Sequence, residues 1–329
     1  MEFSHSAFRR QGASIFMTSV FSPWPENAAA DFGRRPLKLR HNLADSPLFS
    51  DEALIRLIEA TPRKNYHVNT MPCDSNDPHL WREGDMTGLS GSEVLAAVAR
   101  GALWVHLQRT QETDDAYRVL LDAAFEEIER NAPGFKSFKR SMSVLVSSPR
   151  MNVAYHADVP GQSLWQVRGR KRVWIYPARA PFLPRRAIEN IVLRRASDTD
   201  LPFDASFEPH AESYLMEPGD MATWPRNSPH RVVNEDCVNV SFTTEHWTRE
   251  LAAGYVADYA NGLLRPWCGG RDLSRETRGP VFLAKAALAS GHKFIRRFAD
   301  RGTPLTVDFR VAPEAERGFT DVPPYALSK

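Results

Sequence analysis

The sequence is poor in cysteine and holds no long apolar run. Its 329 residues include three cysteines, Cys73, Cys237 and Cys268, and no C-x-x-C pair. An odd and scattered set of this kind excludes a disulfide scaffold and a zinc ribbon, and it favours a reducing, cytoplasmic location. No stretch approaches the roughly 18 uninterrupted apolar residues of a membrane-spanning helix, so we expect no contact with a membrane.

An excess of charge of one sign is also missing. The 42 lysines and arginines nearly balance the 40 acidic residues, which leaves a net charge of +2. This balance excludes a chain that binds nucleic acid along its whole length. Residues 168–195 are the local exception, because they hold nine basic residues against Glu189 alone. An acidic or RNA partner for this stretch stays open, although a solvated surface is the more common role of such a run.

The first 45 residues are expected to form an N-terminal arm. Arg9 and Arg10 precede a mildly apolar stretch, residues 12–21, in the order typical of an export signal. Serine and threonine interrupt that stretch three times, so we do not expect it to direct export. Met17 is an alternative start, which would make residues 1–16 a leader that is foreign to the native protein or untranslated.

Helical patterns dominate residues 46–135. Ser50 precedes a stretch whose apolar side chains recur at helix spacing, and Ser92 is expected to cap a second helix over 93–100. A longer amphipathic pattern covers residues 113–131. We therefore expect a helical N-terminal region that packs on the core that follows.

The apolar period changes near Ser141, where Met142, Val144 and Val146 alternate with serines as in a half-buried strand. Further short strands are predicted over residues 152–158, 164–168, 171–176, 214–217, 221–224, 231–234 and 238–244. Many short strands in succession are typical of a double-stranded jelly roll or barrel. Residues 136–247 are therefore expected to form a jelly-roll core.

Helical periodicity returns after Trp247, over residues 249–264 and 281–298. Residues 248–329 are expected to form a C-terminal helical region. Its last helix either packs on the core or forms the face of a homodimer. The predicted fold class is thus mainly β, a double-stranded β-helix with helical additions on both sides.

The sharpest local motif is His156-Ala157-Asp158. Alternate residues of a strand point to one face, so this triplet can present an imidazole and a carboxylate to one metal ion. His230, which follows Pro229 where a strand begins again, supplies a third ligand. Two histidines and one carboxylate form the facial triad of non-haem Fe(II) oxygenases, which leaves positions on the metal open. His210 and Glu212 form a rival H-x-E triplet.

Two turns flank this motif. Pro218 and Gly219 occupy the central positions of a type II turn before Asp220. Gly169 begins a two-residue loop of the kind that closes a type II′ hairpin, after which Lys171 follows.

In such a hairpin, Lys171 shares an interior face with Val173 and Ile175 and, across the turn, with Gln166 and Leu164. A lysine on an aliphatic face is costly unless an anion meets it. The pattern therefore predicts an anion beside Lys171.

These residues resemble the JmjC and cupin-like hydroxylases, the branch of the Fe(II)/2-oxoglutarate dioxygenases that includes the asparaginyl hydroxylase of hypoxia-inducible factor. In that family a strand carries H-x-D, a lysine follows about thirteen residues later, and a second histidine follows a P-G-D turn. Here 13 residues separate Asp158 from Lys171. The resemblance covers roughly residues 141–247, about a third of the chain.

The resemblance implies that His156, Asp158 and His230 hold Fe(II), and that Lys171 binds the C5 carboxylate of 2-oxoglutarate. Its implied activity consumes O2, decarboxylates 2-oxoglutarate to succinate and hydroxylates a C–H bond of an unidentified substrate. That substrate is a protein side chain, an amino acid or another small molecule.

The chain departs from the family pattern at two positions. Val153 stands where the family often has a threonine that helps to hold the carboxylate, so Tyr155, Ser143 or a residue of the last strand is expected to replace it. Gln166 is also expected to bind the cosubstrate. Glu245 stands where the asparaginyl hydroxylase has an asparagine, and a carboxylate there would repel 2-oxoglutarate unless it points away or is protonated.

A non-catalytic cupin that binds a small ligand or a metal is therefore the alternative function. Under either function, four residues close to the ligands in the sequence are expected to line the pocket, namely Gln162, Trp165, Gln166 and Trp224.

Overall fold

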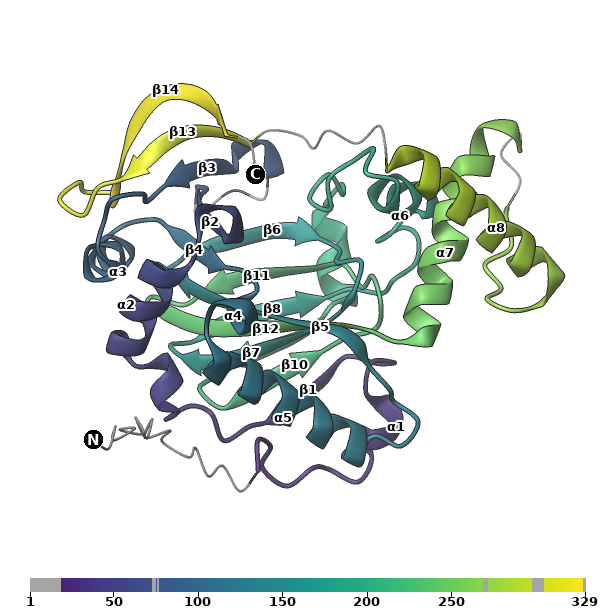
Figure 1. The fold of residues 1–329 in the computed structure, drawn as a ribbon, viewed down its shortest axis with the longest axis horizontal. Coiled ribbons are helices and arrows are strands. Elements are labelled where there is room, and N and C mark those ends of the chain that lie inside the picture. Colours follow the sequence, from purple (N-terminus) through teal and green to yellow (C-terminus); the bar gives the residue numbers. More distant parts are fainter. Residues whose placement is uncertain (1–18, 73–74, 76, 269–271, 298–304, 328–329) are drawn as a thin grey trace, which may run out of the picture.

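Two β-sheets face each other in the computed structural model, which describes residues 19–72, 75, 77–268, 272–297 and 305–327 (Figure 1). Cys73 and the first 18 residues, which include Met17, lie outside the described residues. The predicted core, residues 136–247, supplies all four strands of the small sheet and four neighbouring strands of the large one. The predicted mainly β, jelly-roll architecture is confirmed.

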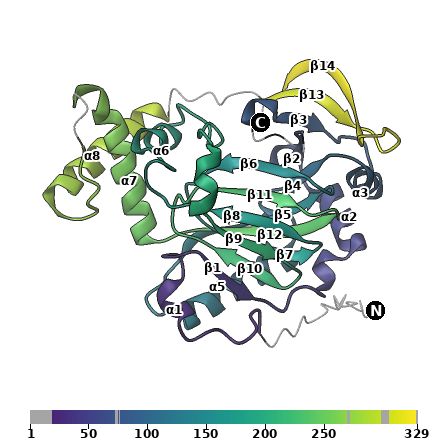
Figure 2. The same ribbon diagram turned by 180° about the vertical axis from the view of Figure 1, so that it is seen from behind.

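The large sheet has ten strands in the order β1-β10-β7-β12-β5-β4-β2-β3-β13-β14. Its strands are β1 (Leu37–Arg40), β2 (Tyr66–Thr70), β3 (Arg82–Asp85), β4 (Trp104–Leu107), β5 (Phe138–Ser147), β7 (Gly161–Arg168), β10 (Asp220–Thr223), β12 (Asn239–Trp247), β13 (Leu305–Val311) and β14 (Phe319–Leu327). The small sheet has the order β6-β11-β8-β9. Its strands are β6 (Asn152–His156), β8 (Lys171–Ile175), β9 (Glu212–Met216) and β11 (His230–Asn234). Figure 2 shows the small sheet from its own side, in front of the large one.

The helices lie on the outside of the two sheets. They are α1 (Ala28–Asp31), α2 (Asp51–Ala60), α3 (Gly91–Arg100), α4 (Thr110–Thr113), α5 (Asp115–Asn131), α6 (Arg185–Val192), α7 (Arg249–Leu264) and α8 (Gly279–Arg296). Short 3-10 turns cover Pro47–Phe49, Arg63–Asn65, Pro78–Leu80, Ala205–His210 and Arg265–Trp267. Helices α6, α7 and α8 gather at one end of the sheets (Figure 1). Within the described residues, none of these helices has the length and apolar character needed to span a bilayer.

Alternation along the strands separates two apolar layers. The space between the sheets is filled by Leu145, Leu164, Val173, Ile175, Met216, Ala222, Trp224 and Val232. The other face of the large sheet packs against α2, α3 and α5, where the rings of Trp165 and Phe242 stack at 5.1 Å. Trp165 therefore lies on the helix-covered side, and the prediction that it lines the pocket is wrong. Its strand neighbours Leu164 and Gln166 face inward instead, because strand side chains alternate.

The helix starts follow local capping rules. Ser50 caps α2 as predicted, since its hydroxyl accepts a hydrogen bond from the Ala53 N–H at 3.3 Å. Helix α3 begins earlier than predicted, because Ser90 rather than Ser92 is its cap. Ser90 and Glu93 form a reciprocal capping box, which satisfies two free N–H groups at once.

The N-terminal region contains more than helices, which corrects the expectation for residues 46–135. Strands β2, β3 and β4 extend the large sheet beyond β5, and β1, within the predicted arm, pairs with β10. Strands of four or five residues show too few alternations to stand out from the helical patterns around them.

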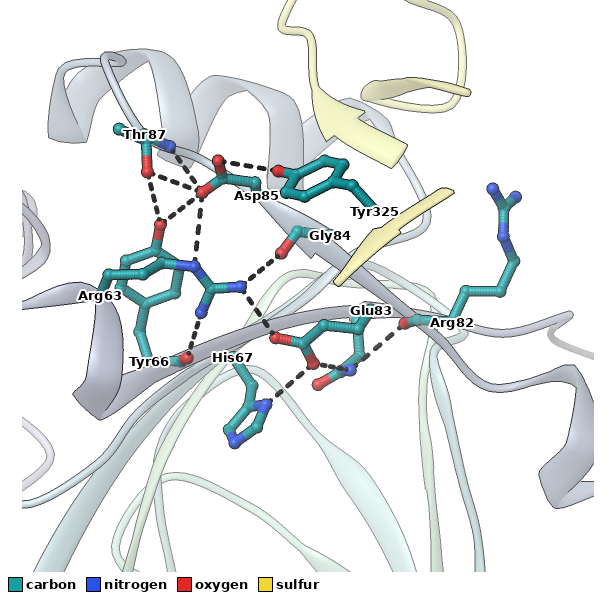
Figure 3. Close-up of polar contacts among 10 residues, drawn as sticks. Arg63, Tyr66, His67, Arg82, Glu83, Gly84, Asp85, Thr87 and Tyr325 are labelled. Atoms are coloured by element: carbon teal, nitrogen blue, oxygen red, sulfur yellow. Dashed lines mark hydrogen bonds and ion pairs between the residues drawn. The ribbon is translucent and has the colours of Figure 1, made fainter. Parts of the chain in front are cut away.

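The C-terminal region also departs from its all-helical prediction. Helices α7 and α8 are present, but β13 and β14 then form a hairpin whose first strand runs parallel to β3. Asp85 on β3 anchors this hairpin, because it accepts hydrogen bonds from the Tyr66 hydroxyl at 2.7 Å and the Tyr325 hydroxyl at 3.3 Å (Figure 3). Arg63 lies 3.5 Å from the same carboxylate.

The predicted β7–β8 hairpin is wrong. Strand β7 belongs to the large sheet and β8 to the small one, so the chain crosses between sheets at Gly169. Lys171 pairs with Asn234 on β11 and Met216 on β9. Gln166 therefore lies on the opposite wall rather than beside Lys171. A two-residue loop with glycine suits a change of sheet as well as a hairpin, because the positive φ of 73° at Gly169 fits any sharp reversal.

Candidate metal centre and cosubstrate pocket

The structure brings His156, Asp158 and His230 together. His156 ends β6, His230 begins β11, and the two residues are opposite each other in the antiparallel pair. Asp158 follows two residues after β6. One ligand atom from each residue lies within 4.8 Å of the others. The three side chains thus converge on one point at the end of the small sheet.

Backbone carbonyls fix how both imidazoles face this point. The His156 Nδ1 lies 2.8 Å from the Ala154 carbonyl oxygen, and the His230 Nδ1 lies 3.1 Å from that of Ser228. A carbonyl oxygen only accepts, so each Nδ1 carries the proton and each Nε2 offers a lone pair. Burial, with a smaller contribution from His156, holds the pKa of His230 well below its usual range. Both rings therefore turn their Nε2 atoms, the usual metal-binding atoms of such a tautomer, away from these carbonyls.

Asp158 supplies the negative charge of the group. Its side chain is 17% exposed, and its Oδ2 atom has no hydrogen-bond partner but lies 3.3 Å from the Nε2 of His230. Burial raises the pKa of Asp158 to about 7, with His156 opposing the shift. A buried carboxylate oxygen without a donor is costly, and a divalent cation would satisfy it. The donor set and its orphaned oxygen fit Fe(II).

The loop between β10 and β11 holds these ligands in place. Asn227, with a positive φ of 60°, donates from Nδ2 to the Asp158 carbonyl oxygen at 2.8 Å. Arg226 Nη2 lies 2.5 Å from Asp258 on α7, and Arg275 binds the same carboxylate at 2.8 Å. These loop and helix residues were not predicted from the sequence. The Asn-Ser-Pro segment just before His230 was a signal for Asn227, because asparagine tolerates positive φ.

Lys171 lies inside the space between the sheets. Its side chain is 4% exposed, and its ammonium group donates to the Ser241 hydroxyl of β12 at 2.9 Å. Burial lowers the pKa of Lys171 to about 7. Ile175, four residues further along β8, is opposite His230, so Lys171 and the metal ligands lie at different depths of one interior.

Of the other three residues predicted to bind the cosubstrate, two face the interior and one does not. Ser143 is buried on the face of β5 that also presents Leu145 to the interior. Gln166 is fully buried and donates to the Asn239 side chain at 2.7 Å, while its Oε1 atom has no partner. Tyr155 does not join them, because its hydroxyl donates to the Phe182 carbonyl oxygen at 2.9 Å in the cluster outside the small sheet.

The two departures from the family pattern both face the interior. Val153 packs against the inner apolar cluster. Burial raises the pKa of Glu245, although Arg109 opposes the shift, and Glu245 pairs with Gln162 across β12 and β7. The raised pKa favours the protonated form, which reduces repulsion of an anionic cosubstrate.

The rival triplet does not form a metal group with other described residues. His210 packs against the Phe182 ring at 5.4 Å, and Glu212 accepts a hydrogen bond from the Tyr214 hydroxyl. Trp224, in contrast, lies where predicted, with its ring centroid 4.5 Å from that of His230.

The chain was compared with curated proteins and with solved structures. No curated protein matches the sequence. Solved structures of YcfD, a ribosomal oxygenase from Escherichia coli, align with 86% of this chain at 17% identity. The complex with cobalt and 2-oxoglutarate has a TM-score of 0.46 over 68% of its chain, and the complex with cobalt and succinic acid has 0.45 over 68%. A further YcfD structure has 0.48 over 69%.

Residues 122–251 match the JmjC domain family. That range contains the strands from β5 to β12 and all three converging ligands, so the chain carries a JmjC domain there.

Proposed function

We propose that this protein is an Fe(II)- and 2-oxoglutarate-dependent dioxygenase that hydroxylates a C–H bond of its substrate. The observation that carries the proposal is the convergence of two imidazoles and one carboxylate with an unpartnered oxygen, whose ligand atoms lie within 4.8 Å of one another. The JmjC match supports the same reaction class. In this proposal His156, Asp158 and His230 are the catalytic metal ligands.

The remaining residues bind the cosubstrate and exclude water. Lys171 anchors the C5 carboxylate of 2-oxoglutarate, with the Ser241 hydroxyl beside it. Ser143 and Gln166 supply polar groups on the facing wall, whereas Tyr155 is left out. The bound iron supplies O2 activation coupled to 2-oxoglutarate decarboxylation. The apolar inner layer keeps that chemistry away from bulk water.

Anaerobic titration with Fe(II) and 2-oxoglutarate tests the proposal. We expect an optical charge-transfer band, and succinate formation once O2 is admitted. The His156→Ala variant should lose iron, whereas His210→Ala, the matched control from the rival triplet, should retain it. Iron loading without the band and without 2-oxoglutarate turnover would rule out the dioxygenase.

A non-catalytic cupin is the second candidate, and Glu245 and Val153 favour it. Glu245 places a second carboxyl group near that of Asp158, and Val153 has no hydroxyl to offer at the expected anion site. The Glu245→Gln variant distinguishes the two. A dioxygenase should keep or improve its affinity for 2-oxoglutarate, while a cupin with another ligand should bind 2-oxoglutarate in neither form.

We further propose a cytoplasmic homodimer that forms through α8. This helix exposes large apolar side chains on its surface, namely Val281, Leu283, Leu288, Phe294 and Ile295. Exposed apolar patches of this kind commonly mark protein contacts. Sedimentation of the full chain tests the dimer, and Leu283→Glu should convert it to a monomer.

Substrate identity stays among protein side chains, amino acids and other small molecules, and nucleic acid is not favoured as the substrate.

A further inference from the structure

Three hydrogen-bond acceptors gather beside the metal ligands. Glu245, near the end of β12, is opposite Gln162 of β7 in the antiparallel pair, so both side chains lie on one face of the large sheet. Ser241, four residues before Glu245, bonds Lys171 in the interior, which makes this face the inner one. We call Gln162, Glu245 and Asn227 of the β10–β11 loop the acceptor rim.

Two amide oxygens of the acceptor rim lack a donor. The Oε1 atom of Gln162 and the Oδ1 atom of Asn227 are buried, and neither accepts a hydrogen bond from a described residue. Asn227 is 4% exposed, and its Nδ2 atom already donates to the Asp158 carbonyl oxygen at 2.8 Å. A buried acceptor without a donor is costly, so a molecule that brings N–H groups would be stabilised there.

Glu245 adds a carboxyl group that is also unsatisfied. Its side chain is half-buried, and no donor among the described residues forms a hydrogen bond with its carboxyl oxygens. Arg109 offsets its charge only in part, because the Arg109 side chain is 62% exposed and forms an ion pair with Glu112 at 3.4 Å. A cation bound beside Glu245 would favour its charged form.

A further carboxylate stands on the open side of the metal ligands. The Ala157 N–H donates to the Asp198 carbonyl oxygen at 3.4 Å, which holds residues 197–200 against the strand end that carries Asp158. Within the described part of the chain, the Asp198 carboxylate accepts a hydrogen bond from the Ser197 hydroxyl but forms no ion pair. Burial raises the pKa of Asp158, and the carboxyl groups of Asp198 and Glu245 add to the shift.

The charges of the proposed metal centre cancel before a substrate is counted. Fe(II) and Lys171 carry three positive charges, and Asp158 and 2-oxoglutarate carry three negative ones. Lys171 cannot serve Glu245 as well, because it bonds Ser241, which lies about 13 Å from Glu245 at the usual rise of a strand. Glu245 and Asp198 are therefore left for a cation that the protein itself does not supply.

We propose that the acceptor rim selects a substrate that carries a cationic nitrogen group, an amine or a guanidine. This inference rests on the proposed hydroxylation and narrows its substrate class. The Glu245 carboxylate pairs with the cation, and the amide oxygens of Gln162 and Asn227 accept its other N–H groups. Glu245 departs from the family pattern, so this preference is a property of this chain.

Calorimetric titration of the full chain, loaded with Fe(II) and 2-oxoglutarate without O2, tests the selection with two probes of similar shape. The cation n-butylammonium should bind at least about tenfold more tightly than neutral butan-1-ol, because a charged hydrogen bond is strong where water is scarce. In Glu245→Gln, which keeps the shape and removes the charge, the two probes should bind alike. Glu250→Gln, the matched control, changes an exposed glutamate in the first turn of α7 and should keep the wild-type preference.

Several results would overturn the proposal. They are equal affinity of the wild type for the two probes, undetectable binding of both, an unchanged preference in Glu245→Gln, and an equal loss in Glu250→Gln. Gln162→Leu removes one amide oxygen and should weaken n-butylammonium several-fold. It keeps the proposal testable if Glu245→Gln does not fold, and an unchanged affinity in it would then contradict the role of the acceptor rim.

Failure of the proposed function gives a different pattern. If the charge-transfer band is absent but n-butylammonium binds in a Glu245-dependent manner, the dioxygenase is ruled out and the cation site remains. If the band and succinate both form while the two probes bind alike, the dioxygenase stands and the selection of a cation is wrong.

Discussion

Lys171 is the residue on which the cosubstrate assignment depends. In the Lys171→Ala variant we expect the KM for 2-oxoglutarate to rise by about tenfold or more, because a charged hydrogen bond contributes roughly 1.5–3 kcal/mol. Iron binding should stay intact, since Lys171 and the ligands lie at different depths of the interior. Succinate formation against 2-oxoglutarate concentration, with iron content measured in parallel, checks both points.

Lys64→Ala, which removes an exposed lysine from the 3-10 turn Arg63–Asn65, is the control. It should leave the KM unchanged. An unaltered KM in Lys171→Ala itself would place the carboxylate anchor elsewhere.

At the residue scale the sequence was informative where chemistry and spacing coincide. His156, Asp158, His230 and Lys171 were all predicted. The structure brings the two histidines and the aspartate together and buries Lys171 inside the same domain. Ser241 was covered only by the expectation that a residue of the last strand helps to hold the carboxylate, because a serine on that strand carries no local signal of its own. Its partnership with Lys171 depends on the two sheets facing each other.

At the scale of elements, α7 is tied to the loop that carries His230. The Arg226→Met variant removes a guanidinium that pairs with the buried Asp258. We expect the Kd for iron to rise about tenfold and stability to fall by about 2–3 kcal/mol, because a buried carboxylate loses a charged donor. Metal titration and urea unfolding measure the two effects.

Arg226→Lys separates positioning from general stability. It restores a cation, so the iron affinity should recover in part. If Arg226→Met loses stability but binds iron like the wild type, the contact between α7 and the loop does not position the ligands.

The C-terminal hairpin depends on Asp85, as the network in Figure 3 indicates. Burial alone would raise the pKa of Asp85, but hydrogen bonds from Tyr66 and Thr87, with Arg63, outweigh it and lower the pKa. Its stabilising effect is thus present above the unfolded value of 3.8 and is lost as the pH falls through the lower folded value. We expect Asp85→Asn to cost about 1–3 kcal/mol at neutral pH.

Urea unfolding at neutral and acidic pH measures this loss, and the variant should converge with the wild type in acid. Asp321→Asn, at an exposed partner of Arg82 on the same hairpin, is the control and should change stability little. Equal unfolding midpoints for wild type and Asp85→Asn at neutral pH would show that the hairpin is held by packing alone.

The element scale also shows why local patterns mislead. The Gly169 turn was predicted as a hairpin, and β13 and β14 were not predicted at all. Both outcomes depend on which strand becomes the neighbour, and that choice is made by distant segments such as β11, β9 and β3. A short strand has too few alternating residues to be recognised from its own sequence. Whether it forms therefore depends on the strand with which it pairs.

For the whole molecule, we expect stability to fall in mild acid. Burial lowers the pKa of His41 and of His246 to about 4, below the 6.5 of an exposed histidine. The unfolded chain therefore binds more protons between these values, so stability is complete above about pH 6.5 and declines toward pH 4. Each group contributes up to about 3 kcal/mol to this loss.

The His246→Phe variant tests the origin of the slope. The ring of His246 packs against Phe125 at 5.5 Å and Phe135 at 5.0 Å, so phenylalanine fits the contacts and removes the titration. Urea unfolding at about pH 7 and about pH 5 should show a smaller difference for the variant than for the wild type. An identical difference in both proteins would assign the acid sensitivity to other groups.

The sequence by itself determined the candidate metal ligands and the jelly-roll core, since H-x-D, the lysine thirteen residues later and the second histidine lie within one run of short strands. Tertiary structure alone decided how the balanced total charge is distributed. Within the basic stretch of residues 168–195, Arg168 and Arg185 pair with distant acids, whereas Arg194 lies near Lys293 and Arg296 of α8. Composition sums charges over the chain, but a site depends on which charges folding brings within a few ångströms, where screening is weakest.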